Sequence, residues 1–252
     1  MMFDLRGHVS VITGGNGGIG LGMARGLAKS GANIAIWARN KEKNAQAVAE
    51  LKGLGVDARA FLCDVSMEEQ IVKSMADTLA YFGGVDSCFA NAGIGTPKPL
   101  AETTMEDWNK VLDVNLTGVF MTFREAAKHM IARGSGGKLI ATSSIGSIHG
   151  MPRNSSYSAT KAGVTAIVRS LAVELGRYNI QVNAIIPGWI TTDMTVRARA
   201  FEKLNKTVIQ RTPAHRWGEP KDFEGLAVYL ASPESNFQTG TTIPIDGGYT
   251  IF

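Results

Sequence analysis

The residues best suited to proton chemistry are a tyrosine and a lysine four positions apart, Tyr157 and Lys161. They stand in a segment with a strong helical pattern, and residues four apart share one helix face, so both side chains can reach the same place. A free phenol has a pKa of about 10, which is too high for proton exchange near neutrality. A neighbouring ammonium group stabilises the phenolate and lowers that pKa. The pair could therefore act as acid and base, although this spacing often occurs without any function.

Two serines lie where they could join this pair. Ser144 closes a predicted strand thirteen residues before Tyr157, and its hydroxyl could hold a substrate oxygen or simply form a turn. Its neighbour Ser143 is the alternative, and packing or capping is the expected role of that side chain. The sequence thus predicts a hydroxyl and a phenol at the end of the same strand.

An asparagine adds a fourth polar group. Asn115 shares a stripe at helical spacing with Trp108, Leu112 and Val119. A buried asparagine among apolar neighbours needs hydrogen-bond partners. Tying the helix to nearby backbone is the structural interpretation, and a catalytic role can exist beside it.

A glycine-rich turn follows the first predicted strand and opens the first predicted helix. Glycines permit a tight turn and a close backbone approach to a pyrophosphate, while the helix N-terminus presents oriented N–H groups. Glycines also simply end strands, so the position after the first strand is what makes this turn a predicted dinucleotide site. The residues assigned to the cofactor here are Gly14, Asn16, Gly17, Gly18, Ile19 and Gly20.

Short β-branched runs alternate with longer helical patterns along most of the chain. The predicted strands are His8–Thr13, Asn33–Trp37, Ala58–Leu62, Asp86–Ala90, Lys138–Thr142, Gln181–Ile186 and Thr242–Ile245. The predicted helices are Gly18–Ser30, Lys41–Lys52, Glu68–Tyr81, Met105–Arg133, Ser156–Tyr178 and Lys221–Ala231. This alternation predicts an α/β fold, a doubly wound, Rossmann-like, seven-stranded parallel sheet with helices on both faces.

The alternation of strands and helices also predicts the domain organisation. No repeat or linker-like composition interrupts this alternation, so residues 1–252 are expected to form a single dinucleotide-binding and catalytic domain. The segment 193–217, after the sixth strand, departs from the alternation, and ligands bind beyond the carboxyl ends of strands in such sheets. We predict that this segment is a substrate lid, with an ordinary surface excursion as the alternative.

Composition narrows the partners. Lys and Arg number 26 against 22 Asp and Glu, with no basic run, so a nucleic-acid partner is not expected. No apolar run approaches the roughly 20 residues of a membrane-spanning helix. Cys63 and Cys88 read as reduced core thiols, and the first residues do not resemble a signal peptide, which favours a cytoplasmic location. His149 and His215 have no other potential metal ligands at a suitable spacing, so no metal is predicted.

Taken in order, these motifs resemble the short-chain dehydrogenase/reductase family. The matches are T-G-x-x-x-G-I-G at residues 13–20, N-A-G at 91–93, Ser144 and Y-x-x-x-K at 157–161, and the resemblance spans residues 7–250. It implies an oxidoreductase that interconverts a ketone or aldehyde and an alcohol by hydride transfer, usually as a homotetramer. By this resemblance Ser144 and Tyr157 hold the substrate oxygen, Lys161 lowers the tyrosine pKa and holds the nicotinamide ribose, and Asn115 holds a water for proton relay.

The resemblance also assigns further cofactor contacts. Asp64 and Val65 would lie beside the adenine ring, although Asp64 could instead cap the following helix. The N-A-G motif would stabilise the central sheet near the adenosine ribose, and the segment after the sixth strand would hold the nicotinamide carboxamide. The residues so assigned are Asn91, Ala92, Gly93, Pro187, Gly188, Ile190, Thr192 and Met194.

The choice of nicotinamide cofactor rests on the end of the second strand. Ala38 stands where NAD-dependent relatives carry an aspartate, and it is followed by Arg39 and Asn40. An arginine there can clamp a 2′-phosphate with a charge-assisted fork, or be a solvated residue at a helix start. Gly17 stands where many NADP-dependent relatives carry a second basic residue. We predict NADP(H), with NAD(H) as the alternative.

Substrate identity is less constrained. The candidate pocket residues are Ile94, Gly95, Ile145, His149, Met151, Asn154, Trp189 and the segment 195–210. Trp189, Met151 and Ile94 favour an apolar or alicyclic carbonyl compound, whereas Arg197 and Arg199 keep acidic or acyl-carrier substrates open. The alternatives are a sugar or polyol dehydrogenase, a 3-oxoacyl-carrier ketoreductase, an epimerase or dehydratase, and a catalytically silent dinucleotide-sensing regulator.

Overall fold

The computed structural model describes residues 2–252 and is built on one seven-stranded parallel sheet in the order β3-β2-β1-β4-β5-β6-β7. The strands are β1 (Val9–Thr13), β2 (Asn33–Ala38), β3 (Ala58–Leu62), β4 (Ser87–Ala90), β5 (Gly137–Thr142), β6 (Ile180–Pro187) and β7 (Thr242–Ile245). The chain runs outward from β1 to β3 and then returns to place β4 beside β1. The predicted doubly wound parallel sheet is therefore confirmed.

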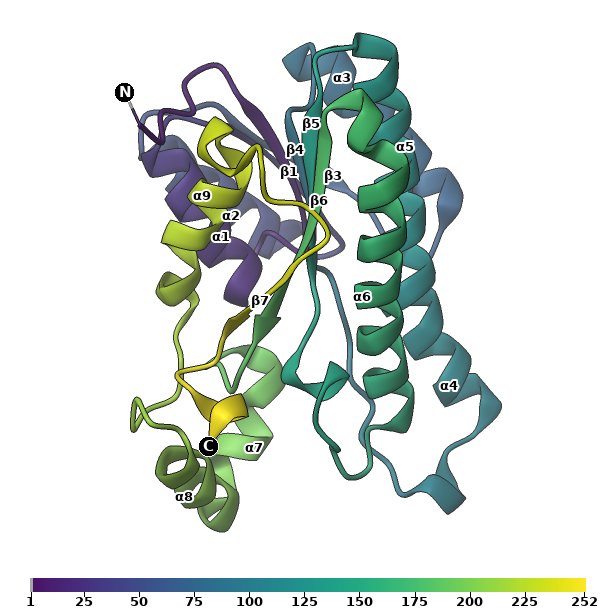
Figure 1. Ribbon diagram of the computed structural model, residues 1–252, viewed down its shortest axis with the longest axis vertical. Coiled ribbons are helices and arrows are strands. Elements are labelled where there is room, and N and C mark those ends of the chain that lie inside the picture. The colour runs from purple at the N-terminus through teal and green to yellow at the C-terminus, as the bar shows by residue number, and fades with distance from the viewer. Residues whose placement is uncertain (1) are drawn as a thin grey trace.

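Helices cover both faces of the sheet, as Figure 1 shows. One layer holds α1 (Gly18–Lys29), α2 (Lys41–Lys52) and α9 (Glu224–Ala231). The other layer holds α3 (Glu68–Phe82), α4 (Met105–Leu112), α5 (Gly118–Arg133) and α6 (Ser155–Leu175). Two short helices, α7 (Val196–Ala200) and α8 (Glu202–Arg211), lie at the carboxyl end of the sheet, near the C-terminus (Figure 1).

Alternation along each strand divides the core between the two layers. Val11 and Cys88 pack into the core beneath α3, α5 and α6, whereas their neighbours Ile12 and Phe89 pack into the core beneath α1 and α9. Strands buried on both faces read as continuous apolar runs. Cys63 and Cys88 are free thiols inside the first of these cores, as predicted.

The prediction of one helix over Met105–Arg133 was wrong. Residues Asp113–Thr117 form a π-helical turn between α4 and α5. The wider turn changes the helical phase, so Asn115 and Val119 are buried while Trp108 and Leu112 are only half-buried. π-turns inside helices often occur at functional sites, and this one carries Asn115.

The segment 193–217 is largely helical, which periodicity did not predict. Its base is closed by a bridge between Ile190 and Gly218, and Trp217 Nε1 donates a hydrogen bond of 2.7 Å to Asn205 Oδ1. Val208 and Trp217 supply its buried apolar contacts. The segment is therefore a folded helical pair fastened at both ends, with few apolar contacts of its own.

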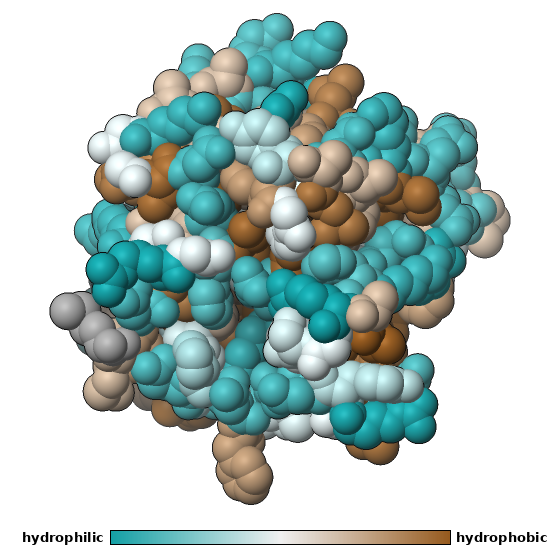
Figure 2. Space-filling view, turned by 90° about the horizontal axis from the view of Figure 1, so that it is seen from above, coloured by the Kyte–Doolittle hydropathy of each residue, from teal (hydrophilic) through white to brown (hydrophobic). Residues whose placement is uncertain are grey.

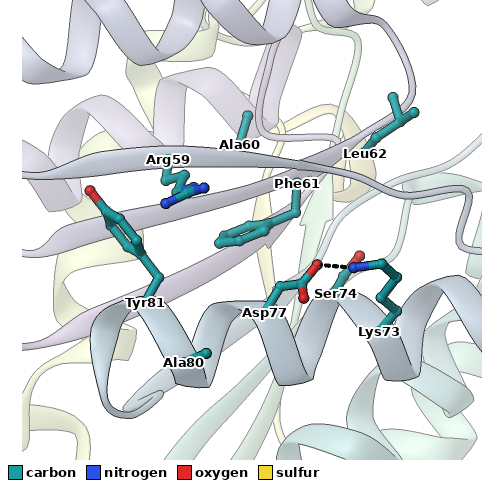
Figure 3. A pocket seen from close by; sticks show the side chains of 9 residues that line it. All are labelled: Arg59, Ala60, Phe61, Leu62, Lys73, Ser74, Asp77, Ala80 and Tyr81. Carbon is teal, nitrogen blue, oxygen red and sulfur yellow. Dashed lines mark hydrogen bonds and ion pairs between the residues drawn. The ribbon is translucent and has the colours of Figure 1, made fainter.

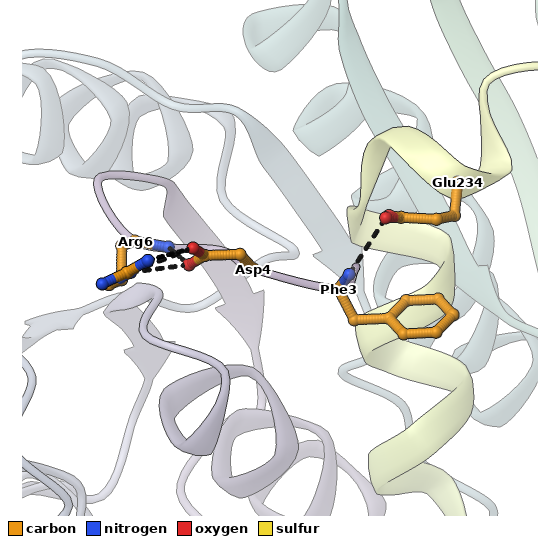
Figure 4. Close-up of polar contacts among 4 residues, drawn as sticks. All are labelled: Phe3, Asp4, Arg6 and Glu234. Carbon is orange, nitrogen blue, oxygen red and sulfur yellow. Dashed lines mark hydrogen bonds and ion pairs between the residues drawn. The ribbon is translucent and has the colours of Figure 1, made fainter. Parts of the chain in front are cut away.

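The N-terminal residues are held at the opposite end of the sheet. Phe3 N donates to Glu234 Oε1 at 3.0 Å, and Asp4 pairs with Arg6 (Figure 4). Leu5 is fully buried. This end of the molecule presents a mostly hydrophilic face with small apolar groups between the polar side chains (Figure 2). Within residues 2–252, no helix has the length and apolar character to cross a membrane.

Candidate active site

The predicted polar residues meet at the carboxyl ends of β1, β4, β5 and β6. The strand order reverses between β1 and β4. In open α/β sheets, the crevice at such a reversal is where ligands bind.

The glycine turn after β1 is shaped by close backbone approach. Gly14 and Gly18 have φ of 65° and 51°, a left-handed conformation that other residues rarely adopt. A Cβ on Gly20 would lie 2.4 Å from the carbonyl oxygen of Gly14, so no side chain fits there. Helix α1 begins at Gly18 with no acidic residue in its first turn. Its free N–H groups make the turn suited to a phosphate.

Three other residues of this turn have distinct places. Gly17 is the extended N-cap of α1, and Ile19 packs against the core beneath that helix. Asn16 Nδ2 donates to Asn44 Oδ1 at 2.7 Å, and Asn44 Nδ2 in turn donates to the Ala38 carbonyl at 3.0 Å. The Asn16 side chain therefore ties the turn to α2 and the end of β2.

The N-A-G segment knits three strands together. Asn91 Nδ2 donates to the Thr13 carbonyl at 3.0 Å, and Asn91 Oδ1 accepts from Thr142 Oγ1 at 3.2 Å. Thr13 Oγ1 accepts from the N–H groups of Asn91 and Ala92 at 2.9 and 3.0 Å. The ends of β1, β4 and β5 are thus locked together, as the resemblance implied.

The end of β2 carries the expected basic residue. Arg39 is 64 % exposed, and its Nη1 lies 3.2 Å from Asp64 Oδ2. Asn40 is the N-cap of α2 and accepts from Lys43 N at 2.8 Å. Lys43, which the sequence did not single out, lies 2.6 Å from Asp193 at the start of the 193–217 segment. Two cations and two carboxylates therefore border this end of the crevice.

Asp64 does not cap α3, contrary to one of the sequence-based alternatives. Met67 is the N-cap of that helix, and Asp64 Oδ1 instead accepts from Ser66 N and Oγ at 3.0 and 2.7 Å. Burial acts to raise the pKa of Asp64, but the hydrogen bonds from Ser66 and Arg39 hold it below its usual value. Its neighbour Val65 is buried in the core beneath α5.

Tyr157 and Lys161 lie on α6 and face the same place, as predicted. The Lys161 ammonium is 5.6 Å from the centre of the Tyr157 ring and donates to the Thr142 carbonyl at 2.7 Å. Lys161 is 3 % exposed, and burial lowers its pKa to about 8. A cation over the face of a phenol ring is also a favourable arrangement in itself.

The expected lowering of the tyrosine pKa is not found in the chain by itself. Burial raises the pKa of Tyr157, and a hydrogen bond with Ser144 opposes that rise. Removing a phenol from water disfavours its anion. The ammonium of Lys161 lies over the ring and is directed to the backbone of β5, so it does not outweigh that cost.

The two serines after β5 divide their roles as expected. Ser144 Oγ accepts from Gly146 N at 3.0 Å and stands beside the Tyr157 hydroxyl. Ser143 Oγ donates to the Lys161 carbonyl at 2.9 Å and is buried. Ser143 is therefore a packing residue that fastens β5 to α6, and Ser144 is the hydroxyl beside the phenol.

Asn115 bridges the π-turn and the loop after β4. Its Oδ1 accepts from Ile94 N at 2.8 Å, and its Nδ2 donates to the Ile94 carbonyl at 2.9 Å. A Cβ on Gly93 would lie 3.3 Å from Asn115 Oδ1 and 3.5 Å from Lys161 Nζ. Asn115 and Lys161 therefore converge on the backbone of Gly93, and the predicted structural role of the asparagine is confirmed.

The segment after β6 closes over the glycine turn. A Cβ on Gly18 would lie 3.2 Å from Thr192 Cγ2, so Thr192 packs directly against the phosphate turn. Pro187 ends β6, Gly188 passes against Asp246, and Ile190 is buried. Met194 is 55 % exposed. Most of this segment is thus held close to the crevice, while Met194 faces solvent.

Some of the predicted substrate residues lie close to Tyr157 or Ser144. A Cβ on Gly95 would lie 3.9 Å from the tyrosine ring. A Cβ on Gly146 would meet Met151 Sδ at 2.7 Å and both Ser144 Oγ and Ser158 Oγ at 3.5 Å. Ile145 is buried, while Asn154 Nδ2 donates to the Pro152 carbonyl. The wall beside the phenol is therefore built from both apolar and polar side chains.

Sequence reasoning missed the C-terminal side of this wall. Tyr249 lies edge-on to Trp189 and His149, with ring centres 6.4 and 6.3 Å apart. Trp189 also packs edge-on against Trp217 at 5.5 Å, and the Arg211 guanidinium lies 4.4 Å from the Tyr249 ring centre. A pocket of about 150 Å³ opens beside Trp189, lined in part by Ala214 and Gly247. Only the glycines of the turn at 246–248 hinted at this arrangement.

Buried polar atoms without partners concentrate in this region. Among residues 2–252, seven buried side-chain nitrogen or oxygen atoms lack a hydrogen-bond partner. Five of them stand on the segments at the carboxyl edge or in the 193–217 segment. They are Thr96 Oγ1, His149 Nε2, Ser158 Oγ, Trp189 Nε1 and Arg199 Nε. Native proteins pair most buried polar atoms, so this concentration indicates a place where a polar ligand completes the hydrogen bonds.

A larger hollow lies away from these residues. It has a volume of about 580 Å³ and is bordered by β3 and α3, with Arg59 over the Tyr81 ring and a Lys73–Asp77 ion pair (Figure 3). None of the predicted site residues lines it. Within the described residues, no group of three or more His, Cys, Asp or Glu side chains is arranged to hold a metal ion.

The chain is similar to known proteins over nearly its whole length. A family model described as enoyl-(acyl carrier protein) reductase matches residues 14–250. The chain is 38 % identical over 247 residues to a 2-dehydro-3-deoxy-D-gluconate 5-dehydrogenase of Escherichia coli (strain K12), covering 98 % of this chain and 97 % of the relative.

Two solved structures share the fold closely. A gluconate 5-dehydrogenase from Burkholderia cenocepacia J2315, in complex with NADP and tartrate, is 37 % identical with a TM-score of 0.95, covering 99 % of this chain and 98 % of the other. A short-chain type dehydrogenase/reductase from Mycobacterium marinum is 34 % identical with a TM-score of 0.94, over the same shares of both chains. The chain therefore belongs to the short-chain dehydrogenase/reductase family, and it is an NAD(P)-dependent oxidoreductase that acts on CH–OH groups.

Proposed function

We propose that this protein is an NADP(H)-dependent dehydrogenase of sugar acids or related polyols, which interconverts a secondary alcohol and a ketone. The observation that carries the proposal is the meeting of Ser144, Tyr157 and Lys161 at the carboxyl edge of the sheet. The Ser144 side chain opposes the rise in the pKa of the Tyr157 phenol, and the Lys161 ammonium lies over the phenol ring. The hydroxyl and the phenol can grip one substrate oxygen from two sides.

The residues of the chain have these roles in the proposed reaction. Ser144 and Tyr157 hydrogen-bond the substrate oxygen, and Tyr157 takes the hydroxyl proton during oxidation or returns it during reduction. Lys161 holds the nicotinamide ribose and supplies positive charge next to the phenol. A nicotinamide held there would supply the hydride chemistry and, in its oxidised form, a positive charge near the phenol.

That added charge addresses the raised pKa of Tyr157. Burial raises the pKa of Tyr157 and so disfavours the phenolate. A second positive charge beside it favours the phenolate, because an opposite charge within a few ångströms stabilises the ionised form. Proton transfer at Tyr157 would thereby be coupled to a bound cofactor, and Asn115 supports a relay from Lys161 to solvent.

The cofactor site is proposed along the same crevice. The Gly14–Gly20 turn would hold the pyrophosphate, Asp64 and Val65 would border the adenine, and the Asn91–Gly93 segment would border the adenosine ribose. Ile190 and Thr192 would hold the nicotinamide carboxamide. A 2′-phosphate would replace Asp64 as the partner of Arg39, with Lys43 close by as a second cation. These two cations favour NADP(H), and NAD(H) is the alternative.

A polar substrate fits the wall better than the apolar or alicyclic compound first expected. The unpartnered atoms of His149, Ser158 and Trp189 offer hydrogen bonds to a molecule rich in oxygen. Leaving such atoms unpaired costs about 1–3 kcal/mol each. The names of the relatives, a sugar-acid dehydrogenase and a structure holding tartrate, point in the same direction.

The proposal includes closure of the site by the 193–217 segment. This segment acts as a lid, since it is joined to α2 by the Lys43–Asp193 ion pair and carries few apolar contacts.

The proposal also includes assembly into a homotetramer. The outward face of α6 presents small or apolar residues such as Ala162, Ala166 and Val173, which would allow helix packing between subunits. Sedimentation velocity tests that assembly.

The decisive experiment is turnover with both cofactors. D-gluconate, 2-dehydro-3-deoxy-D-gluconate, sorbitol and a 3-oxoacyl thioester are each offered with NADP(H) and NAD(H), and the absorbance of the reduced cofactor is followed. We expect turnover of a sugar acid with a preference for NADP(H). Turnover of the thioester alone would assign the protein to acyl-carrier reduction instead.

Tyr157→Phe tests the mechanism. Because the variant keeps the ring and loses only the acid, we expect turnover to fall by about 10²–10⁴-fold while cofactor binding is kept. Fluorescence titration with NADPH supplies the control for an intact site. Undiminished turnover in this variant would remove Tyr157 from the reaction.

A further inference from the structure

One cation near the substrate wall has no negative partner. Arg211 ends α8, is half-buried, and lies with its guanidinium 4.4 Å from the centre of the Tyr249 ring. Within residues 2–252, none of the ion pairs closer than 4.0 Å involves Arg211. An arginine stacked on an aromatic face is oriented while its N–H fork stays free for an anion.

Tyr249 sets the position of that arginine. It follows Gly247 and Gly248, whose φ values of 65° and 90° turn the chain back toward the crevice. Cβ atoms on these glycines would come within 2.8 Å of Thr212 and 2.9 Å of Pro213, so the turn packs tightly against the end of the lid. The C-terminal turn and the lid therefore hold Tyr249 and Arg211 as one unit.

This unit is joined to the substrate wall. The Tyr249 ring lies edge-on to His149, from the segment after β5, and to Trp189, from the segment after β6. His149 Nε2 and Trp189 Nε1 are both buried without a partner. Ser144 stands five residues before His149 on the same segment. These aromatic side chains thus lie between Ser144 at the reacting end of the site and the Arg211 guanidinium.

Several other cations of this half of the molecule already have partners. Lys161 donates to the Thr142 carbonyl. Arg39 and Lys43 pair with Asp64 and Asp193 at the cofactor end. The pairing of Arg216 is bidentate, with Asp222. Arg199 has an unpartnered Nε but no aromatic contact within the described residues.

We infer that Arg211, stacked on Tyr249, binds the carboxylate of the substrate at the end remote from the reacting carbon. The inference rests on the proposed function, since a sugar acid carries a carboxylate and a polyol does not. A guanidinium and a carboxylate match as two parallel hydrogen bonds, which fixes orientation as well as charge. Selectivity for acids over neutral polyols then resides in the lid and the C-terminal turn, outside the Ser144–Tyr157–Lys161 group.

The test measures binding separately from turnover. The probes are L-tartrate and D-gluconate as acids and sorbitol as a neutral polyol, titrated into the NADPH-loaded protein, in which these alcohols cannot be oxidised. The signal is tryptophan fluorescence, because Trp189 and Trp217 lie beside the site. We expect the parent protein to bind the acids more tightly than sorbitol. Arg211→Gln is expected to lose about ten- to hundredfold in affinity for the acids, with little change for sorbitol.

Companion variants keep the result interpretable. Arg211→Lys retains the charge and is expected to recover part of the acid preference, while Tyr249→Ala releases the guanidinium and is expected to lower it. The sequence left Arg197 open as a contact for an acidic substrate, but its side chain is exposed in the structure, so Arg197→Gln is expected to change neither affinity. Thermal melting confirms that each variant is folded.

Three outcomes overturn the assignment. One is a parent protein that binds acids no better than sorbitol. Another is an Arg211→Gln variant that keeps the acid preference. The third is an equal loss in Arg197→Gln, which would show a diffuse charge effect. Each of these outcomes can occur while the protein still oxidises alcohols. Failure of carboxylate binding by Arg211 is therefore distinguishable from failure of the proposed function.

Discussion

The two halves of the crevice differ in how completely their polar groups are paired. On the cofactor side, Thr13, Asn91 and Thr142 satisfy one another across three strands, and Asn16 is fastened to Asn44. On the substrate side, His149, Ser158 and Trp189 each keep a buried atom without a partner.

This difference separates a rigid binding surface from one that a ligand completes. A fully paired network holds its geometry before anything binds, so it suits a cofactor common to a whole family. Unpaired buried atoms cost stability and are tolerated where a ligand supplies the missing hydrogen bonds. The substrate side therefore trades stability for recognition, and variants in the two halves should behave in opposite ways.

The largest effect is expected at Gly20, in the paired half. In Gly20→Ala the new methyl group would meet the Gly14 carbonyl oxygen at 2.4 Å, which forces the phosphate turn to move. We expect cofactor affinity to fall at least about hundredfold and the protein to lose about 1–3 kcal/mol of stability. Calorimetric titration with NADPH and thermal melting measure both effects.

Gly225→Ala is the matched control for that variant. Its added methyl group would meet nothing within 4 Å, and the residue lies in α9 beside α1. We expect unchanged cofactor affinity and equal or slightly higher stability. Equal damage in both variants would show that the phosphate turn is not specially constrained.

The next largest effect is expected at Arg39. Arg39→Asp replaces the proposed 2′-phosphate partner with a carboxylate, which repels that phosphate and can accept a hydrogen bond from a ribose hydroxyl. We expect kcat/KM with NADPH to fall about 10–100-fold while that with NADH is kept or rises. Steady-state kinetics with both cofactors measures the ratio, and an unaltered ratio would refute the NADP(H) assignment.

A smaller effect concerns Lys161 and pH. Burial lowers its pKa to about 8, below the value in the unfolded chain, so the unfolded state binds more protons above pH 8. The free energy of unfolding should therefore gain a stabilising contribution as pH rises from about 8 to about 9.5. Below pH 8 the buried charge carries its full cost.

Lys161→Met removes that titration. We expect the stability of the variant relative to the parent to be greatest near pH 7 and to decline by about 1–2 kcal/mol toward pH 9.5. Urea unfolding of the cofactor-free proteins across this range measures it. Parallel stability curves for the two proteins would contradict the lowered pKa.

The smallest effects are expected at two serines, Ser143 with a hydrogen-bonded hydroxyl and Ser158 with an unpartnered one. Ser143→Ala loses the hydrogen bond to the Lys161 carbonyl and should cost about 1 kcal/mol. Ser158→Ala loses a hydroxyl that has no partner, so its stability should be unchanged or slightly raised while KM for a sugar acid rises a few-fold. Urea unfolding and steady-state kinetics separate the two, and equal destabilisation would erase the distinction between the halves.

Much of the fold was predictable because its signals are local. Every strand was located to within one or two residues, since β-branched runs flanked by helical patterns mark them directly. The sequence also placed Tyr157 and Lys161 on one helix face, where their side chains do lie close together. The π-turn at Asp113–Thr117 was not predicted, because a change of helical phase leaves no mark in an otherwise continuous pattern.

The substrate side was less predictable for a different reason. Arg211 and Tyr249 lie thirty-eight residues apart and meet only because the turn at Gly247 and Gly248 packs against the end of the lid. The sequence predicted a lowered pKa for Tyr157, whereas the structure raises it. The reason is that the cost of burying the phenolate depends on everything that surrounds the phenol and not on the lysine spacing alone.

By itself, the sequence determined the family, the sheet and the residues able to move a proton. These depend on short spacings that a helix turn or a strand end converts directly into shared position. Only the tertiary structure decided which polar groups are paired, which have no hydrogen-bond partner and where the Arg211 guanidinium lies. Pairing and burial are sums over distant segments, and no local pattern contains them.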